Sequence, residues 1–471
     1  MTTESIDVER VVTGLASSGC EFADLFLEER TGSTLVFEGG KVDRIRQGID
    51  RGVGLRVIRD KRTLYAFSSE VSPRAVNDMA DSLIGAGDSS ATLQELSWMP
   101  REIRPLSVIG RDPGLVDLDH KIGLLRQADD AARSMGDEIV QVRCVFADER
   151  RRVIQANSEG VHFEFLRVGL IFMVHVTARR GDLLQTGYEP VGGQWGMELF
   201  DRTAPDEIAS RAASRALMML DAREAPSGRM PVILHSDAGG TMIHEAVGHG
   251  LEADFIKENM SVYARSLGKK VASKLVSVVD DPTIPNLRGS YPVDDEGTPA
   301  RRTVLVEDGI LKGFLFDRLN ALRQDATSTG NGRRESYRHK PIPRMSNTMI
   351  LPGAGSPEEI LRDTPHGLLV KKMGGGQVNP VNGDFVFEVA EGYLIEDGRQ
   401  GAPVRGATLV GNGPRVLSSI DMVGNDLGFA IGTCGKDGQG VPVSDAQPTL
   451  RIGTPDNPDT WITVGGTASS A

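Results

Sequence analysis

The stretch that decides the fold spans residues 230–252 and reads MPVILHSDAGGTMIHEAVGHGLE. Its apolar start, Met230 to Leu234, predicts a short strand, and Gly239-Gly240 then turns the chain. Thr241 can cap a helix, so the pair His244-Glu245 falls in the first turn of that helix. The sequence therefore predicts a strand, a tight turn and a helix that presents a histidine and a carboxylate.

The spacing of the two histidines in this stretch limits the helix geometry. Familiar zinc peptidases carry His-Glu-x-x-His, which puts both imidazoles on one helix face. Here His244 and His249 are five residues apart, and five residues of a regular α-helix turn through about 500°, so the two rings would diverge by roughly 140°. A π-helical turn brings such a pair back to one face, and Gly248 tolerates the distorted backbone. We therefore expect a π-turn or a break beside Gly248 and one zinc-type ion shared by His244 and His249.

A catalytic zinc site needs a third protein ligand and keeps its fourth position open for water. Glu252 is close in sequence, whereas Cys434 lies in a glycine-rich segment, and residue types alone leave both possible. Glu245 is the expected general base toward the metal-activated water. Tyr337 and His339 are candidates, by residue type only, for stabilising an oxyanion.

The overall charge argues against one broad class of function. The chain carries 53 lysines and arginines against 65 acidic residues, a net charge of −12, which does not suit binding to nucleic acid through a general basic field. The first residues lack the features of a signal peptide, and no apolar run approaches the length of a membrane span. We expect a cytoplasmic protein that binds neither nucleic acid nor a membrane.

The cysteines do not suggest disulfide bonds. The three cysteines are odd in number and widely separated, so a disulfide framework is not expected. Cys20 and Cys144 fall at a helix end and in a strand, where structural roles are expected, which leaves Cys434 as the cysteine available for a ligand role.

The distribution of helix and strand signals predicts an α+β protein: two smaller α+β units, residues 1–100 and 101–226, followed by a large, mostly antiparallel β-rich unit, residues 227–471. Each smaller unit has a helix at either end, over about residues 6–17, 72–85, 117–134 and 206–220. Short separate strands are predicted between these helices, among them residues 25–27, 35–37, 139–146, 152–156, 161–165 and 169–176. In the large unit, Asp308-Gly309 and Glu391-Gly392 each predict a hairpin turn.

Five segments of the chain resemble the TldD/PmbA family of metalloproteases, specifically its TldD branch. They are His244-Glu-Ala-Val-Gly-His249-Gly-Leu-Glu252, Val293-Asp-Asp-Glu-Gly-Thr-Pro299, Ser328-Thr-Gly-Asn-Gly332-Arg, Ile420-Asp-Met-Val-Gly-Asn-Asp426 and Cys434-Gly-Lys-Asp-Gly-Gln439. The companion TldE/PmbA branch lacks the His-Glu-x-x-x-His segment, so its presence here indicates the metal-bearing subunit.

This resemblance implies more than the spacing does. It implies that His244, His249 and Cys434 hold the metal and that Glu252 has a supporting role. It further implies a heterodimer with a TldE/PmbA-like subunit, or a homodimer where none exists, which hydrolyses unfolded peptides or peptide leader segments. A sheet-rich unit suits a substrate bound as an added strand.

Two other functions remain open at the level of sequence. A metal ion on two histidines and a cysteine also suits an amidase-type hydrolase. The metal could instead be structural in a regulatory binding protein, for example one that modulates a topoisomerase. A structural zinc site is closed by four protein ligands, so an open fourth position distinguishes the two cases.

Overall fold

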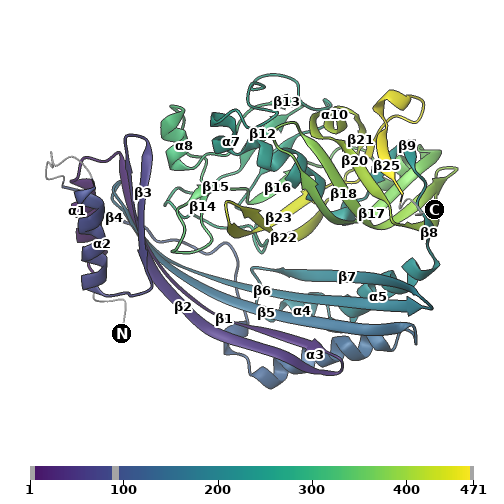
Figure 1. Cartoon of the computed structure of the whole chain (residues 1–471), viewed down its shortest axis with the longest axis horizontal. Coiled ribbons are helices and arrows are strands. Elements are labelled where there is room, and N and C mark those ends of the chain that lie inside the picture. Colours follow the sequence, from purple (N-terminus) through teal and green to yellow (C-terminus); the bar gives the residue numbers. More distant parts are fainter. Residues whose placement is uncertain (1–5, 87–94, 467–471) are drawn as a thin grey trace.

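A long curved sheet forms one side of the molecule and faces a β-rich C-terminal unit (Figure 1). The structure is a computed structural model that describes residues 6–86 and 95–466. The long sheet has seven strands in the order β3-β2-β1-β5-β6-β4, with β7 paired to β6. Its strands are β1 Phe22–Glu38, β2 Lys41–Arg59, β3 Arg62–Ser68, β4 Met99–Pro100, β5 Ile139–Asn157, β6 Val161–Arg180 and β7 Leu183–Gly193.

Both of the smaller predicted units contribute to this one sheet. Strands β1 and β5 pair antiparallel from Asp24 opposite Asn157 to Glu38 opposite Arg143. The α+β fold class is confirmed, because helices and mostly antiparallel strands alternate in the expected order. The division at residues 100 and 226 stays a prediction.

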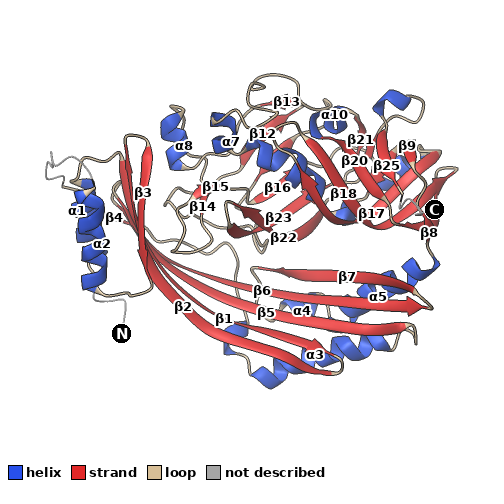
Figure 2. Cartoon of the chain, in the orientation of Figure 1, coloured by secondary structure: helices blue, strands red, loops and turns tan. Residues whose placement is uncertain are grey.

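The four predicted helices of these units are present, and together with one short helix that was not predicted they cover the sheet in two groups (Figure 2). Ser72 caps the second helix by accepting a hydrogen bond from the backbone of Ala75. The first two helices pack at one end of the sheet, and the next three pack along its outer face. They are α1 Val8–Ala16, α2 Pro73–Gly85, α3 Leu118–Arg133, α4 Leu199–Arg202 and α5 Pro205–Asp221; a short 3-10 turn, Pro113–Leu115, precedes α3.

The strands of the long sheet are longer than the sequence predicts. The runs Leu25–Leu27 and Leu35–Phe37 were expected as separate strands, but both belong to β1. The charged segment between them stays in the sheet because its charges are paired, with Glu28 accepting hydrogen bonds from Arg30 and Arg151. The short strands expected within β5 and within β6 merge in the same way.

The C-terminal unit packs two further sheets around one large apolar core. The ten-stranded sheet has the order β21-β24-β10-β17-β18-β20-β25-β9, with β19 and β8 at its side, and the six-stranded sheet has the order β13-β12-β11-β16-β23-β22. The strands are β8 Arg223–Glu224, β9 Gly228–Met230, β10 Val232–Leu234, β11 Val278–Asp280, β12 Thr303–Glu307, β13 Ile310–Leu311, β14 Gly332–Arg333, β15 Ile342–Pro343, β16 Asn347–Ile350, β17 His366–Val378, β18 Asp384–Glu396, β19 Arg399–Arg405, β20 Thr408–Asn412, β21 Ile420–Val423, β22 Gly428–Lys436, β23 Gln439–Gln447, β24 Leu450–Ile452 and β25 Ile462–Gly465. The helices after residue 251 are α7 Ala253–Lys257, α8 Arg318–Arg323, α9 Pro357–Arg362 and α10 Gly413–Ser418, with a 3-10 turn at Pro458–Thr460.

One of the two predicted hairpins in this unit is confirmed and the other is wrong. Asp308 and Gly309 both have positive φ and join β12 to β13. Glu391-Gly392, in contrast, lies inside β18, with Gly392 paired to Val370 on one side and to Val404 on the other. The turn signal fails there because the irregular register between β17 and β18 accommodates the glycine within the strand.

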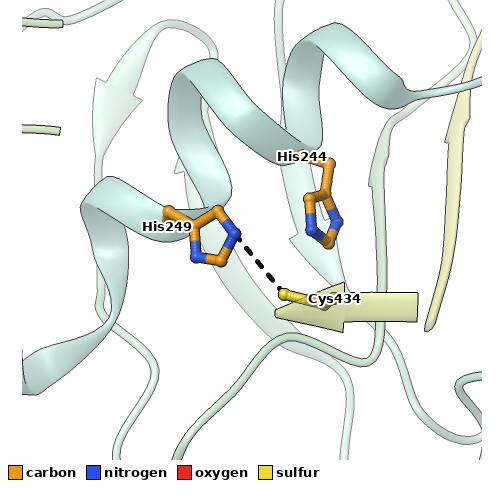
Figure 3. A group of neighbouring side chains, drawn as sticks. All are labelled: His244, His249 and Cys434. Atoms are coloured by element: carbon orange, nitrogen blue, oxygen red, sulfur yellow. Dashed lines mark hydrogen bonds between the residues drawn. The ribbon is translucent and has the colours of Figure 1, made fainter. Parts of the chain in front are cut away.

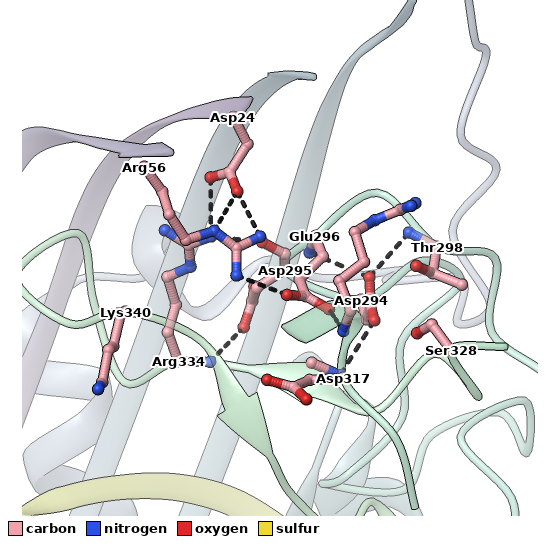
Figure 4. A network of polar contacts seen from close by, with 12 residues as sticks. Asp24, Arg56, Asp294, Asp295, Glu296, Thr298, Asp317, Ser328, Arg334 and Lys340 are labelled. Atoms are coloured by element: carbon pink, nitrogen blue, oxygen red, sulfur yellow. Dashed lines mark hydrogen bonds and ion pairs between the residues drawn. The ribbon is translucent and has the colours of Figure 1, made fainter. Parts of the chain in front are cut away.

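A buried network of charges joins the long sheet to the C-terminal unit (Figure 4). Arg56 of β2 donates to Asp24 of β1 and, at 2.6 Å, to Glu296 of the C-terminal unit. Arg334 donates to the other Asp24 oxygen at 3.1 Å and to the carbonyl of Asp295 at 2.7 Å. The side chains of Asp24, Arg56, Glu296 and Arg334 are all fully buried. At this network the contact between the two parts is therefore ionic and specific in geometry.

Among residues 6–86 and 95–466, each helix is either too short or too polar to span a lipid bilayer.

Candidate metal centre

The motif segment folds as three consecutive short turns of different pitch. After β10, Gly239 adopts a φ of 67°, and a side chain on Gly240 would collide with the backbone of Ala446 in β23. The segment then forms α6 Thr241–Ile243, a π-helical turn His244–Gly248 and a 3-10 turn His249–Leu251. The expected π-turn is confirmed, and the backbone N–H of His249 bonds to the carbonyl of His244, five residues earlier.

This turn brings His244 and His249 to the same side of the segment, opposite Cys434 on strand β22 (Figure 3). One ligand atom from each of the three residues lies within 4.8 Å of the others. The Sγ of Cys434 is 3.4 Å from Nε2 of His249, and the two imidazole rings are 5.2 Å apart at an angle of 88°. The donors are buried and converge from two elements far apart in sequence, which fits a single metal ion.

A carboxylate lies near the Nδ1 atom of each imidazole, and it is within hydrogen-bond distance only at His249. The Nδ1 of His249 is 3.0 Å from Oε2 of Glu252, and the Nδ1 of His244 is 4.0 Å from Oδ2 of Asp445. The sequence left Glu252 open as a third ligand, but in the structure it supports His249. A carboxylate on Nδ1 fixes the ring and leaves Nε2 as the donor toward a metal.

The charges of these groups suit a soft or borderline cation. Burial raises the pKa of the Cys434 thiol, but His244 and His249 outweigh burial and hold it at about 5. Burial likewise raises the pKa of Glu252, yet Lys436 and His249 bring it down to about 2. The thiol and this carboxylate are thus anionic near neutral pH. Thiolate and imidazole together are a donor set typical of zinc.

Two arginines hold the hairpin that carries Cys434. The buried guanidinium of Arg344 donates to the backbone carbonyls of Cys434 and Gln439, near the two ends of the β22–β23 turn. Arg333 donates to the carbonyls of Met345 and Pro442. These contacts fix strand β22 against the motif segment, and no local sequence signal points to them because the partners on the hairpin are at least 90 residues away.

Glu245, the predicted base, follows His244 in the same π-turn and is partly exposed. Within residues 6–86 and 95–466 its side chain makes no hydrogen bond, so it is free to accept one from a bound water or substrate. Its carboxylate is close enough to Asp445 to raise the pKa of that residue, which burial and Glu245 together bring to about 6.

The two residues considered for oxyanion stabilisation are bound elsewhere. The buried Tyr337 donates from its hydroxyl to Asp50 at 3.2 Å, and the ring of His339 is 3.0 Å from the hydroxyl of Ser336. Cys144 is buried in the core beneath the long sheet, as expected for a structural cysteine. The structure therefore brings together His244, Glu245, His249 and Cys434, with Glu252 beside His249, and leaves Tyr337 and His339 with other partners.

Three domain models describing PmbA/TldA metallopeptidases match the chain: domain 1 over residues 23–86, the central domain over 111–220 and the C-terminal domain over 227–455. The chain belongs to this family. Among PmbA/TldD relatives, a Haemophilus influenzae metalloprotease TldD homologue is 35% identical over 95% of this chain and 93% of its own length. A Saccharolobus solfataricus zinc metalloprotease TldD homologue is 27% identical over 92% of this chain and 96% of its own.

Solved structures of similar proteins share the PmbA/TldD fold. A Thermotoga maritima protein described as a candidate modulator of a DNA gyrase aligns with a TM-score of 0.79 at 23% identity, over 97% of this chain and 99% of its own. TldE from Thermococcus kodakarensis aligns with a TM-score of 0.74 at 19% identity, over 94% of this chain and 99% of its own. At these identities the likeness concerns the fold.

Proposed function

We propose that this chain is a zinc-dependent peptidase in which His244, His249 and Cys434 hold one zinc ion and Glu245 is the general base. The convergence of the three donors within 4.8 Å of one another is the observation that carries the proposal. Membership of a metallopeptidase family and the zinc named for the Saccharolobus relative support it.

The bound ion would act as a Lewis acid toward a scissile carbonyl and lower the pKa of a solvent molecule toward about 7. Glu245, partly exposed beside His244, would take the proton from the attacking water and return it to the leaving amine. Glu252 and Asp445 would keep the two imidazoles oriented. Three protein ligands leave a position open, as a catalytic rather than a structural zinc requires.

The proposed substrate is an unfolded peptide or a peptide leader segment that binds in an extended form. Strand β22 is the last strand of its sheet, and on its open side no other strand of the described chain pairs with it. Cys434 pairs with Val441 in the register of this hairpin, so an extended peptide could add to the open edge close to the metal. Backbone hydrogen bonds of that kind give little sequence selectivity.

A TldE/PmbA-like subunit, or a second copy of this chain, would complete the enzyme, which we place in the cytoplasm.

Digestion of unfolded casein and of a blocked peptide by the wild type, with and without a chelator, tests the proposal. Glu245→Gln should retain metal and lose roughly 10²–10⁴-fold in kcat, whereas Glu258→Gln, at an exposed glutamate of the same region, should be fully active. Cleavage of internal peptide bonds separates a peptidase from an amidase that cleaves only small amides. Metal binding without any hydrolysis would favour a regulatory protein, and full activity in Glu245→Gln would exclude this base.

A further inference from the structure

Lys436 is a buried cation that the metal chemistry described above does not use. It lies on β22 two residues after Cys434, and its side chain is 4% exposed. Its Nζ is 3.1 Å from Oε2 of Glu252, 2.7 Å from Oδ1 of Asp254 and 3.1 Å from the carbonyl oxygen of Pro343. These three contacts match the three N–H donors of an ammonium group.

The contact with Glu252 links Lys436 to a proposed metal ligand. The fully buried Glu252 uses one oxygen, Oε2, for both Lys436 and Nδ1 of His249, and its other oxygen has no hydrogen-bond partner among the described residues. Without the ammonium, this carboxylate would be a buried anion held mainly by His249, and burial of an unpaired charge is unfavourable. Lys436 therefore determines where Oε2 lies and, through it, how the ring of His249 is turned.

The position of Lys436 in the chain adds a second constraint. Successive residues of one strand are about 3.3 Å apart along its axis, so the ammonium contact is made by the same short stretch of backbone that presents the Cys434 thiol. The contact between Lys436 and Glu252 thus fixes the positions of Cys434 and His249 relative to each other, although these two metal donors are 185 residues apart in sequence.

We propose that Lys436 is a positioning residue of the metal centre: through Glu252 it orients the imidazole of His249, and through β22 it ties that imidazole to the strand of Cys434. The proposal rests on the metal site of the proposed function. Its consequence is that removal of the ammonium weakens metal binding even though Lys436 does not itself contact the metal.

The test measures metal affinity rather than activity alone. Zn²⁺ affinity is determined by competition with a chromophoric chelator, and the Co²⁺-loaded protein reports the thiolate through its sulfur-to-cobalt charge-transfer band. The variants are Lys436→Met, Glu252→Gln and the double variant. Lys121→Met is the matched control, because Lys121 is an equally buried lysine, 4% exposed, paired with Asp148 in another part of the chain.

Lys436→Met and Glu252→Gln should each bind Zn²⁺ roughly 10–100-fold more weakly and alter the Co²⁺ spectrum, as is typical when the partner of a metal-bound histidine is lost. The double variant should bind Zn²⁺ about as weakly as whichever single variant binds it more weakly. Both changes interrupt the same chain of contacts, from Lys436 through Glu252 to His249. Lys121→Met should lose stability but keep wild-type affinity.

Equal affinities for Lys436→Met and Lys121→Met would overturn the proposal, and so would a double variant whose loss equals the product of the single losses to within about twofold. If Lys436→Met does not fold, the test relies on Glu252→Gln, which preserves the size of the side chain and removes the charge that Lys436 and His249 both contact. Wild-type Zn²⁺ affinity in Glu252→Gln would then overturn the proposal. Failure of the wild type to bind a metal ion would instead refute the proposed function, so the two failures are distinguishable.

Discussion

Gly248 and Met345 pack so closely that no side chain larger than hydrogen fits between them. A Cβ built on Gly248 would lie 1.9 Å from Sδ of Met345, whose side chain is completely buried. The π-turn that aligns the two histidines therefore depends on a glycine at its last position. The sequence indicates a tolerant backbone at Gly248, and the structure adds the close contact with Met345.

Gly248→Ala should destabilise the protein by about 1–3 kcal/mol, the range typical of overpacking a core, and should weaken metal binding because the turn must shift. Chemical denaturation and metal competition measure the two effects. Gly123→Ala is the control: Gly123 lies on α3, and apart from the adjoining backbone of that helix a Cβ at this position would meet no atom of the described chain within 4 Å, so alanine there should be neutral or stabilising. Wild-type stability in Gly248→Ala would show that Met345 moves aside freely.

Cys434→Ala should reduce bound zinc well below one ion per chain after dialysis, because two imidazoles alone do not complete a zinc site. Metal analysis by mass spectrometry measures the stoichiometry. Cys144→Ala serves as a control, since Cys144 is equally a buried cysteine but lies in the core beneath the long sheet. It should retain the metal while losing some stability. Full zinc content in Cys434→Ala would exclude the thiolate as a ligand.

Arg56→Met should destabilise the protein by about 3–5 kcal/mol, because it leaves Glu296 buried without its guanidinium and removes one of the two arginines that hold Asp24. Urea denaturation gives the change in the free energy of unfolding. Arg338→Met removes a more exposed ion pair with Asp50, and the expected cost there is about 0–1 kcal/mol. Similar values for the two variants would mean that the buried network contributes no more than a surface pair.

Asp317, in the same region as this network (Figure 4), should make stability depend on pH. Burial and the nearby Glu296 carboxylate raise the pKa of Asp317 to about 7, whereas an aspartate in the unfolded chain titrates near about 4. Between about pH 4 and pH 7, Asp317 is protonated in the native state and ionised in the unfolded chain. Its contribution to the free energy of unfolding is therefore fully present below about pH 4 and is lost as the pH rises through about 7.

Asp317→Asn should remove that contribution, so the free energy of unfolding should fall less between pH 5 and pH 8 than it does in the wild type. Denaturation curves at both pH values give the comparison, with Asp130→Asn on the exposed side of α3 as the control. An unchanged pH dependence in Asp317→Asn would mean that Asp317 is already ionised at pH 5.

The sequence predicted the local features of this fold better than the tertiary ones. The helices, the β12–β13 hairpin and the π-turn follow from periodicity, from Asp308-Gly309 and from the histidine spacing, all of which depend on neighbouring residues. The lengths of β1 and β5 could not be predicted, because Glu28 and Arg151 interrupt the apolar pattern and are accommodated by ion pairs with each other and with Arg30 and Asp295.

The same distinction applies to the candidate site. The pair His244-Glu245 and the second histidine are visible in one short segment, and the family resemblance favoured Cys434 over Glu252 as the third ligand. The roles of Asp445, Lys436 and Arg344 were not predicted, because they arise from contacts with residues far away in the sequence.

We infer that one metal ion is held by two imidazoles and one thiolate, with a position left for solvent. X-ray absorption at the zinc edge of the loaded wild-type protein measures these ligands. We expect one sulfur neighbour at about 2.3 Å and nitrogen or oxygen neighbours at about 2.0–2.1 Å, with the sulfur signal lost in Cys434→Ser. A wild-type spectrum without a sulfur neighbour would contradict it.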